Sequence, residues 1–240
     1  GAAGIYSFYV DPTDSIIRAS QIYGLAFTST KGVSQVLGRG DIWSKGNKWH
    51  HIYEARFSNI PFNFYGLGSN TLKADEDLVV QNRWRINAEI EKRLSKSYYP
   101  GVGIEFESLN FKDRELGGIF DSENQANLFD KDGGRYAFLK VTQLLDTRNS
   151  NTYTTKGFFG RVRFGYAPDF FGGNNFSGTL FTADTRYFQS LSKKLTLGSQ
   201  LFYETISSNK EIPFYMLRQM GSDQVMRGYY LGRYRDRNYL

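Results

Sequence analysis

The 240-residue chain contains no cysteine and only two histidines. Without thiols it can form neither a disulfide framework nor a thiolate metal site. It also has no run close to the roughly 18 apolar residues that a membrane-spanning helix needs. If this protein crosses a membrane, it must therefore cross with strands, in which lipid-facing side chains alternate with polar ones.

Residue patterns for catalysis are equally scarce. His50 and His51 are adjacent, so on a strand they point to opposite faces and cannot jointly bind a metal ion in the usual way. No serine lies in a Gly-x-Ser-x-Gly elbow, and no cysteine is present to act as a nucleophile. A polar wall residue is the better interpretation of His50.

Two carboxylates at a spacing of two residues could suggest acid–base chemistry. Glu105 and Glu107 share one face of a strand, as paired catalytic carboxylates would. Arg83 and Arg85 on the preceding segment could oppose them, which favours a cross-strand ion network. We therefore expect no enzymatic activity, and we expect neither a metal ion nor a cofactor.

The composition favours a wall with two different faces. Aromatic residues make up 17% of the chain, yet the hydrophobic fraction is only 40% and the mean hydropathy is −0.49. Hydrophobic side chains are therefore spread thinly and regularly. The net charge is +6, but arginines are interleaved with glutamates instead of forming a basic stripe, which argues against a nucleic-acid partner.

The clearest alternation lies in residues 78–94. One face carries Val80, Trp84, Ile86, Ala88 and Ile90, and the other carries Gln81, Arg83, Arg85, Asn87, Glu89 and Glu91. Only strand geometry turns successive side chains to opposite faces in this way. The segment is longer than a typical globular strand of about 5–6 residues and fits a tilted transmembrane strand.

The same period of two recurs along the chain and predicts about ten strands. They cover residues 5–10, 21–28, 33–43, 49–57, 78–94, 102–107, 136–145, 158–166, 181–187 and 195–203. The fold class that this pattern predicts is all-β, an antiparallel up-and-down transmembrane β-barrel. Residues 110–134 are long, polar and aperiodic, so we expect an outer loop there. The aromatic cluster of residues 61–71 is expected at the membrane–water boundary.

Residues 220–236, MGSDQVMRGYYLGRYRD, resist explanation as a strand. Three glycines permit positive φ and close backbone approach: Gly221, Gly228 and Gly232. The segment can therefore turn tightly while it presents Arg227, Tyr229 and Arg233. An arginine in a lumen needs a carboxylate, and its planar fork holds a loop in one place better than lysine would. A solvated glycine-rich hairpin is the alternative interpretation.

Two motifs resemble the BamA/TamA family of outer-membrane assembly and translocation barrels. One is Val225-Met226-Arg227-Gly228-Tyr229, with Gly221 before it and Gly232-Arg233-Tyr234-Arg235-Asp236 after it. The other is the corner Asp146-Thr147-Arg148-Asn149, ahead of Lys156-Gly157-Phe158. The corner is also consistent with an ordinary Asx-type turn held by Asp146 or Asn149.

The resemblance implies that residues 209–237 fold back into the lumen, where Arg227 meets an acid of the inner wall. The motif residues it implies are Gly221, Val225, Arg227, Gly228, Tyr229, Gly232, Arg233 and Asp236. By resemblance the acid lies beyond Leu240. Within the chain, four inner-face acids are possible partners: Glu89, Glu105, Glu107 and Asp184.

The family pattern also implies a barrel of about sixteen strands, so residues 1–240 would be an incomplete part of one barrel domain. The implied location is the outer membrane of Gram-negative bacteria. The implied partners are the lipid bilayer with its lipopolysaccharide, client outer-membrane or exported polypeptides, and other assembly subunits. The expected function is insertion or transport of proteins through an openable strand edge. The alternatives are an anchor or pore for another domain, and a passive porin or structural subunit.

Overall fold

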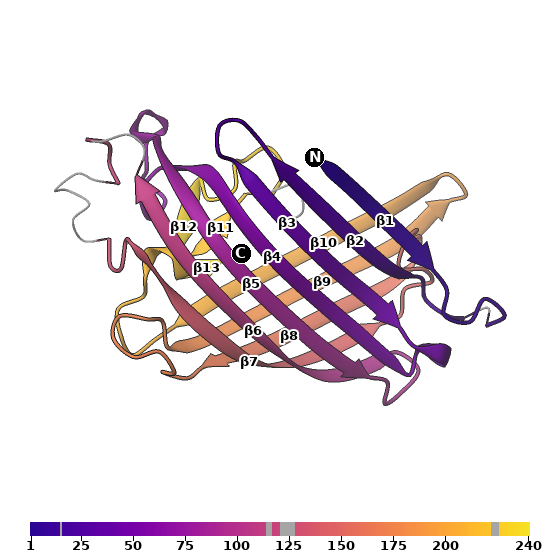
Figure 1. Cartoon of the computed structure of the whole chain (residues 1–240). Helices are drawn as coiled ribbons and strands as arrows, with labels where there is room; N and C mark the ends of the chain where they lie inside the picture. The colour runs from indigo at the N-terminus through magenta and orange to yellow at the C-terminus, as the bar shows by residue number, and fades with distance from the viewer. Residues whose placement is uncertain (15, 114–116, 121–127, 222–225) are drawn as a thin grey trace.

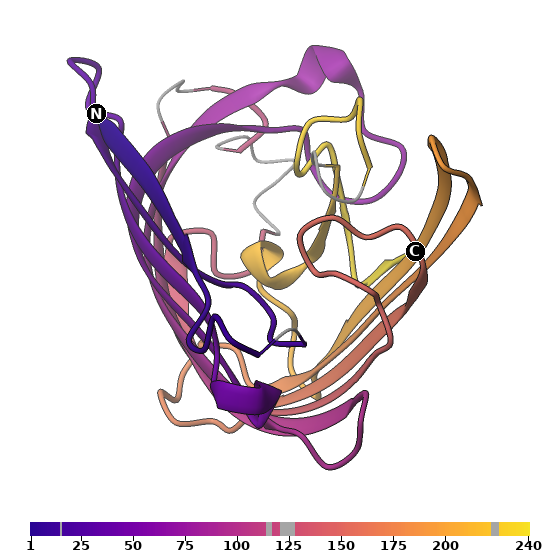
Figure 2. The ribbon, with the colours of Figure 1, turned by 90° about the vertical axis from the view of Figure 1, so that its right-hand side faces the viewer.

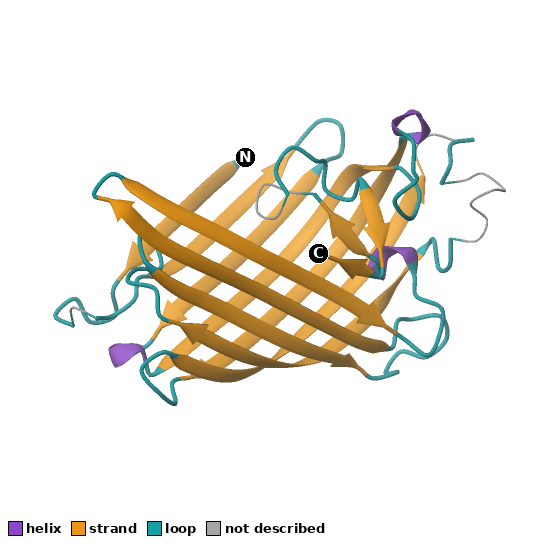
Figure 3. Cartoon of the chain, turned by 180° about the vertical axis from the view of Figure 1, so that it is seen from behind, coloured by secondary structure: helices purple, strands orange, loops and turns teal. Residues whose placement is uncertain are grey.

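The computed structural model describes residues 1–14, 16–113, 117–120, 128–221 and 226–240. Eleven strands form one sheet in the order β1 to β10 and then β13 (Figures 1 and 3). The strands are β1 (Ala2–Phe8), β2 (Ser20–Thr28), β3 (Ser34–Trp43), β4 (Trp49–Phe64), β5 (Asp77–Lys92), β6 (Tyr98–Asp113), β7 (Gly133–Asp146), β8 (Gly157–Ala167), β9 (Gly178–Ser192), β10 (Leu195–Ser207) and β13 (Asn238–Tyr239). From β1 to β10 each strand pairs antiparallel with the next in the sequence. The predicted up-and-down arrangement, with ten strands before the glycine-rich segment, is confirmed.

The sheet has the two different faces that the alternation predicted. On β5, Trp84 and Ile86 are 57% and 56% exposed on the outer face, whereas Glu89 and Glu91 are 3% and 0% exposed on the inner face. Phe164 on β8 is likewise exposed. Apolar side chains therefore cover the outside, where they can contact lipid, and charged side chains line the inside.

Figure 2 shows the strands as a curved wall around a central space that holds segments of the C-terminal part of the chain. The wall does not close within the described residues. The strand β1 pairs only with β2. At the other edge, β13 joins β10 through two residue pairs, Glu204 with Tyr239 and Thr205 with Asn238. The fold is therefore a partial barrel, as the sequence indicated.

The connections differ at the two ends of the strands. One end carries the short turns 44–48, 93–97 and 193–194 together with the longer connections 9–19 and 147–156. The other end carries the short turn 29–33, the longer connections 65–76 and 168–177, and the connection between β6 and β7. The loop predicted at residues 110–134 is shorter than expected at both ends. The strand β6 continues to Asp113 and β7 begins at Gly133, and Asn110 pairs with Gly133. Residues 114–116 and 121–127 of this loop lie outside the described residues.

The expectation that residues 61–71 lie at the membrane–water boundary is wrong for the aromatic side chains. Phe62 and Phe64 continue the inward phase of β4, and Phe64 is fully buried against Phe214, with ring centroids 5.7 Å apart. Tyr65 is also buried. The rings of Phe62 and Phe64 form part of a luminal core because they share the side of β4 that carries Glu54 and Arg56.

Candidate functional site

The inner wall carries a continuous ladder of ion pairs. Arg83 contacts Glu107, and Arg85 lies 3.0 Å from Glu105, measured from Nη2 to Oε2. Lys140 on β7 then bridges Glu105 at 3.2 Å and Glu89 at 2.8 Å. These contacts confirm that Glu105 and Glu107 belong to a cross-strand ion network.

The ladder crosses two intervening strands to reach β8. Glu89 and Glu91 on β5 lie 3.0 Å from Arg163 and Arg161 respectively, both on β8. This reach is possible because the inner face of β6 carries Gly103 opposite Glu89, and Gly101 opposite Glu91. Without a Cβ at these positions, the two glutamates can lie flat across β6.

A direct test of this geometry is Gly103→Ala. A Cβ at Gly103 would lie 2.6 Å from Cγ of Glu89 and 2.7 Å from the carbonyl oxygen of Ala88. We expect the variant to lose about 1–3 kcal/mol of unfolding free energy, because overpacking forces the acid out of place. The matched control is Gly38→Ala, since a Cβ there meets nothing within 4 Å. Equal unfolding midpoints in urea for the two variants would contradict the proposed geometry.

His50 is held between two carboxylates. Its Nδ1 lies 2.6 Å from Oε2 of Glu91 and its Nε2 lies 3.0 Å from Oδ1 of Asp41. The ring also stacks on Trp43 with centroids 3.8 Å apart. His51 points to the other face of the strand, beside Tyr53. The prediction that the two histidines point to opposite faces is confirmed, and His50 is the one that faces the lumen.

Among the described residues, no cluster of three or more histidine and acidic side chains could hold a metal ion. The four acids considered as partners of Arg227 already contact cations of the wall. Glu89, Glu105 and Glu107 belong to the ladder described above, and Asp184 is paired with Arg186 at 2.6 Å. Arg227 itself is exposed. Its role as the residue that fixes the loop stays a prediction.

The chain after β10 packs onto the inner face of the wall. The short helix η4 (Phe214–Met216) is buried, with Phe214 1% exposed. Its ring lies 4.8 Å from that of Phe111 on β6 and 5.6 Å from that of Phe120. The hydroxyl of Tyr215 donates to Asp130 at 2.8 Å, and burial together with this acid raises the pKa of Tyr215.

A small hairpin follows η4 and fastens to the loop between β4 and β5. It consists of β11 (Arg218–Met220) and β12 (Tyr234–Asp236). Arg233 donates from Nη2 to the carbonyl oxygen of Thr71 at 2.7 Å and lies over the ring of Tyr65 at 4.8 Å. The carbonyl oxygen of Arg235 accepts from the backbone N–H of Gly68 at 2.8 Å. This hairpin is therefore bound to the wall through backbone and side-chain contacts.

Arg235 is the most deeply buried cation of this hairpin. It is 3% exposed, and its guanidinium lies over Phe62 at 5.1 Å and Phe64 at 5.8 Å. Burial lowers the pKa of Arg235 to about 10. Its charge is compensated by aromatic faces, which attract cations more strongly in a desolvated site.

The predicted glycines adopt the expected backbone geometry. Gly221, Gly228 and Gly232 have φ of 105°, 94° and 82°. At Gly221 a Cβ would lie 2.3 Å from the carbonyl oxygen of Tyr230, so any larger residue there would break the fold of the hairpin. The ring of Tyr229 lies 6.3 Å from that of Tyr234. Asp236 accepts from the N–H of Arg237 at 2.6 Å, and Val225 lies outside the described residues.

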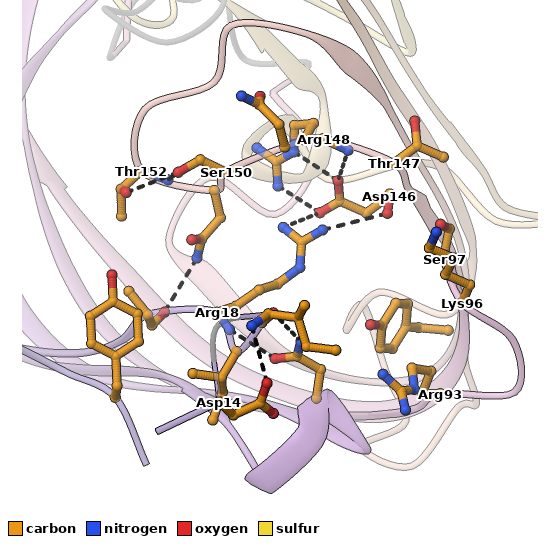
Figure 4. Close-up of a pocket in the computed structure, with 18 of the residues that line it drawn as sticks. Asp14, Arg18, Arg93, Lys96, Ser97, Asp146, Thr147, Arg148, Ser150 and Thr152 are labelled. Atoms are coloured by element: carbon orange, nitrogen blue, oxygen red, sulfur yellow. Dashed lines mark hydrogen bonds and ion pairs between the residues drawn. The ribbon is translucent and has the colours of Figure 1, made fainter. Parts of the chain in front are cut away.

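A polar pocket opens at the short-turn end of the wall (Figure 4). It has a volume of 580 Å³, and Asp146 is one of the residues that line it. Arg18 reaches Asp146 at 3.0 Å from the segment between β1 and β2, and Arg148 reaches it at 2.9 Å. Asn149 accepts from the backbone N–H groups of Thr155 and Lys156, both at 3.1 Å. Asp146 accepts from the backbone N–H of Arg148 at 3.1 Å, so the predicted Asx-type turn is present at Asp146, and Arg18 joins a distant segment to it.

These features define the class of the protein. A curved up-and-down wall with an apolar outside, a charged inside and a folded segment within is the wall of a transmembrane β-barrel. No helix among the described residues has both the length and the apolar character needed to span a bilayer. A family model described as the Omp85 superfamily domain matches residues 23–239, and the chain belongs to this superfamily. It is a bacterial outer-membrane β-barrel protein.

A solved structure supports the fold. BamA from Haemophilus ducreyi lacking POTRA domains 1–3 is similar to this chain, with a TM-score of 0.55 and 13% sequence identity. The match covers 96% of this chain and 46% of that one, so the chain spans less than half of the BamA chain. Among curated proteins, no relative matches the sequence.

Sequence reasoning missed several residues that shape the lumen. The most important are Phe214, Arg235 and the Arg18–Asp146 pair. On β4 every second residue from Glu54 points inward, and Phe62 and Phe64 fall on this series. This alternation could have indicated an aromatic core inside the wall. No comparable signal marks Arg18, because its partner is distant in the sequence.

Proposed function

We propose that this barrel inserts or translocates polypeptides at the outer membrane by offering an openable strand edge of its sheet to an incoming client strand, and we test the edge of β1 for this role. Among the described residues, the side of β1 that faces away from β2 has no strand partner. Its unpaired N–H and C=O groups are a template for strand addition. Each such group costs several kcal/mol if it faces lipid unsatisfied, so the edge favours a partner strand.

The luminal segment supports the same proposal. The described residues of the segment 209–237 supply a hairpin and a short helix, and the helix packs in one cluster with side chains of β4, β6 and β7. We infer that this segment braces the wall from within, because Phe214 packs against rings of both β4 and β6. We propose that Arg227, with the motif residues Gly228 and Tyr229, fixes this loop to an acid of the completed wall.

Site-specific crosslinking tests the role of the β1 edge. The chain has no cysteine, so Tyr6→Cys on β1 adds a single thiol to it. We expect this thiol to form a disulfide with a cysteine in a terminal strand of an unfolded client barrel, because strand pairing brings Cα atoms within the roughly 4.4–6.8 Å that a disulfide spans. The product is counted on non-reducing gels with the full-length protein in membranes.

The matched control for this crosslink is Tyr53→Cys. Tyr53 is also outward and exposed, but β4 has strand partners on both sides. Equal crosslinking at the two positions would contradict strand addition at β1. A protein that inserts normally and crosslinks at neither position would instead support an anchor or pore for another domain.

Alanine substitution tests the role of Arg227. We expect Arg227→Ala to lower the fraction of refolded, heat-modifiable barrel on gels more than Arg233→Ala does. The physical reason is that Arg227 would pair with a carboxylate of the completed wall in our proposal, and an arginine–carboxylate pair that becomes buried there costs more to break than the partly exposed contact of Arg233 with a backbone carbonyl. Equal effects, or none, would remove the proposed role of Arg227.

A further inference from the structure

The outer surface near the turn between β5 and β6 carries a dense group of cations. A groove of 670 Å³ is lined there by Lys48, Lys92, Arg93 and Lys96, together with the exposed ring of Trp49. The three lysines are exposed and Arg93 is half-buried. The backbone N–H of Arg93 donates to the carbonyl oxygen of Lys48 at 2.9 Å, which fixes the two sides of the groove to each other.

Lys48 and Lys92 differ from the cations of the lumen, whereas Arg93 and Lys96 line both this groove and the polar pocket around Asp146. Inside the wall, arginines and lysines pair with carboxylates along the ladder. In the part of the chain that the structure describes, no ion pair joins Lys48, Lys92, Arg93 or Lys96 to an acid. The positive charge of this groove is therefore available to a ligand with negative charge.

The groove lies where the apolar belt of the wall ends. Along the outer face of β4, Tyr53, His51 and Trp49 follow one another toward the short-turn end, and on β5 the exposed Ile90 is followed by Lys92. The ammonium of Lys92 lies 5.3 Å from the ring centroid of Trp49. Tryptophan beside lysine is typical of the membrane–water interface, where rings contact acyl chains and cations contact headgroups.

The surroundings of the groove fit a lipid better than a soluble anion. Ile16 and Leu94, which also line it, are 66% and 64% exposed. A free phosphate ion would gain nothing from these apolar side chains, whereas a lipid would cover them with its glycerol and upper acyl groups. Short turns of outer-membrane barrels face the periplasm, so the groove faces the phospholipid leaflet.

We propose that this groove binds an anionic phospholipid of the periplasmic leaflet. Lys48, Lys92 and Lys96 contact the headgroup phosphate, and Trp49 contacts the chains below it. Basic clusters beside a membrane-embedded surface are a recurring way of holding anionic headgroups. The bound lipid lies against β4 and β5, away from both edges of the sheet.

Native mass spectrometry of the full-length protein in detergent tests this proposal. The probes are dioleoyl phosphatidylglycerol and dioleoyl phosphatidylcholine, titrated separately. We expect one phosphatidylglycerol to be retained preferentially, and we expect Lys92→Gln/Lys96→Gln to weaken its binding roughly tenfold or more. The matched control is Lys193→Gln/Lys194→Gln, which removes the same charge from an exposed turn at the same end of the wall.

Three results would overturn the proposal. One is equal retention of phosphatidylglycerol and phosphatidylcholine. Another is an equal loss of phosphatidylglycerol binding in the two double variants, which would indicate a general attraction of the lipid to the lysines at this end of the wall. The last is full displacement of the lipid by millimolar inorganic phosphate, which would show that the groove recognises a free anion.

Discussion

Replacing Glu89 with alanine is expected to lower the free energy of unfolding by about 3–5 kcal/mol, the cost of breaking a buried ion pair from one side. Glu89 is 3% exposed and pairs with Lys140 on β7 and Arg163 on β8. Removing it leaves two cations with less compensation inside the wall. Urea unfolding of the barrel in detergent micelles, followed by tryptophan fluorescence, measures the change.

The matched control is Glu211→Ala. Glu211 is exposed, and in the described part of the chain it forms no ion pair, so its replacement is expected to change the free energy by less than about 0.5 kcal/mol. If both variants unfold at the same urea concentration, the ladder does not stabilise the wall. A double variant, Glu89→Leu with Arg163→Leu, is expected to recover part of the loss because it leaves fewer unpaired charges.

Phe214→Ala is the second substitution with a large expected effect, a loss of about 3–5 kcal/mol. The ring of Phe214 is 1% exposed and contacts rings from β4, from β6 and from the β6–β7 connection. Its removal leaves a cavity that joins these elements and frees residues 209–220 from the inner wall. Limited trypsin digestion should then cleave faster at Lys210 and Arg218.

Phe170→Ala serves as the control for this prediction, since Phe170 is 63% exposed on the loop between β8 and β9. It is expected to leave both stability and cleavage unchanged. Slow cleavage of Phe214→Ala, with a wild-type unfolding midpoint, would mean that the segment is held by the β11–β12 hairpin alone.

Much of the fold could be predicted from the sequence because strands of this length repeat a simple period. Trp84 has an even number and Glu89 an odd one, so they lie on opposite faces of the same strand. This alternation alone assigns Trp84 to the lipid face and Glu89 to the lumen. The same counting predicts which face His50 occupies. The cross-strand network followed from the placement of Arg85 and Glu107 on neighbouring strands with the same inward phase.

The luminal contacts could not be predicted in the same way. The phase of Phe62 and Phe64 places them inside, but their partner Phe214 lies in an aperiodic segment distant in sequence. The buried position of Arg235 over the rings of Phe62 and Phe64 likewise depends on how a short hairpin folds against the loop between β4 and β5. The pairing of Arg18 with Asp146 joins the segment before β2 to the end of β7. These strands are far apart in the order of the sheet, and only the curvature of the wall brings the two residues together.

The reach of Glu89 and Glu91 across β6 has a mechanical consequence. Side chains tie β5 through β8 together across the strands, in addition to the backbone hydrogen bonds, so this part of the wall is stiff. By contrast, β1 and β2 are joined along only Ala2–Phe8 and carry paired glycines, Gly4 beside Gly24. When the wall flexes, we expect it to bend near β1 and to keep its shape around β6.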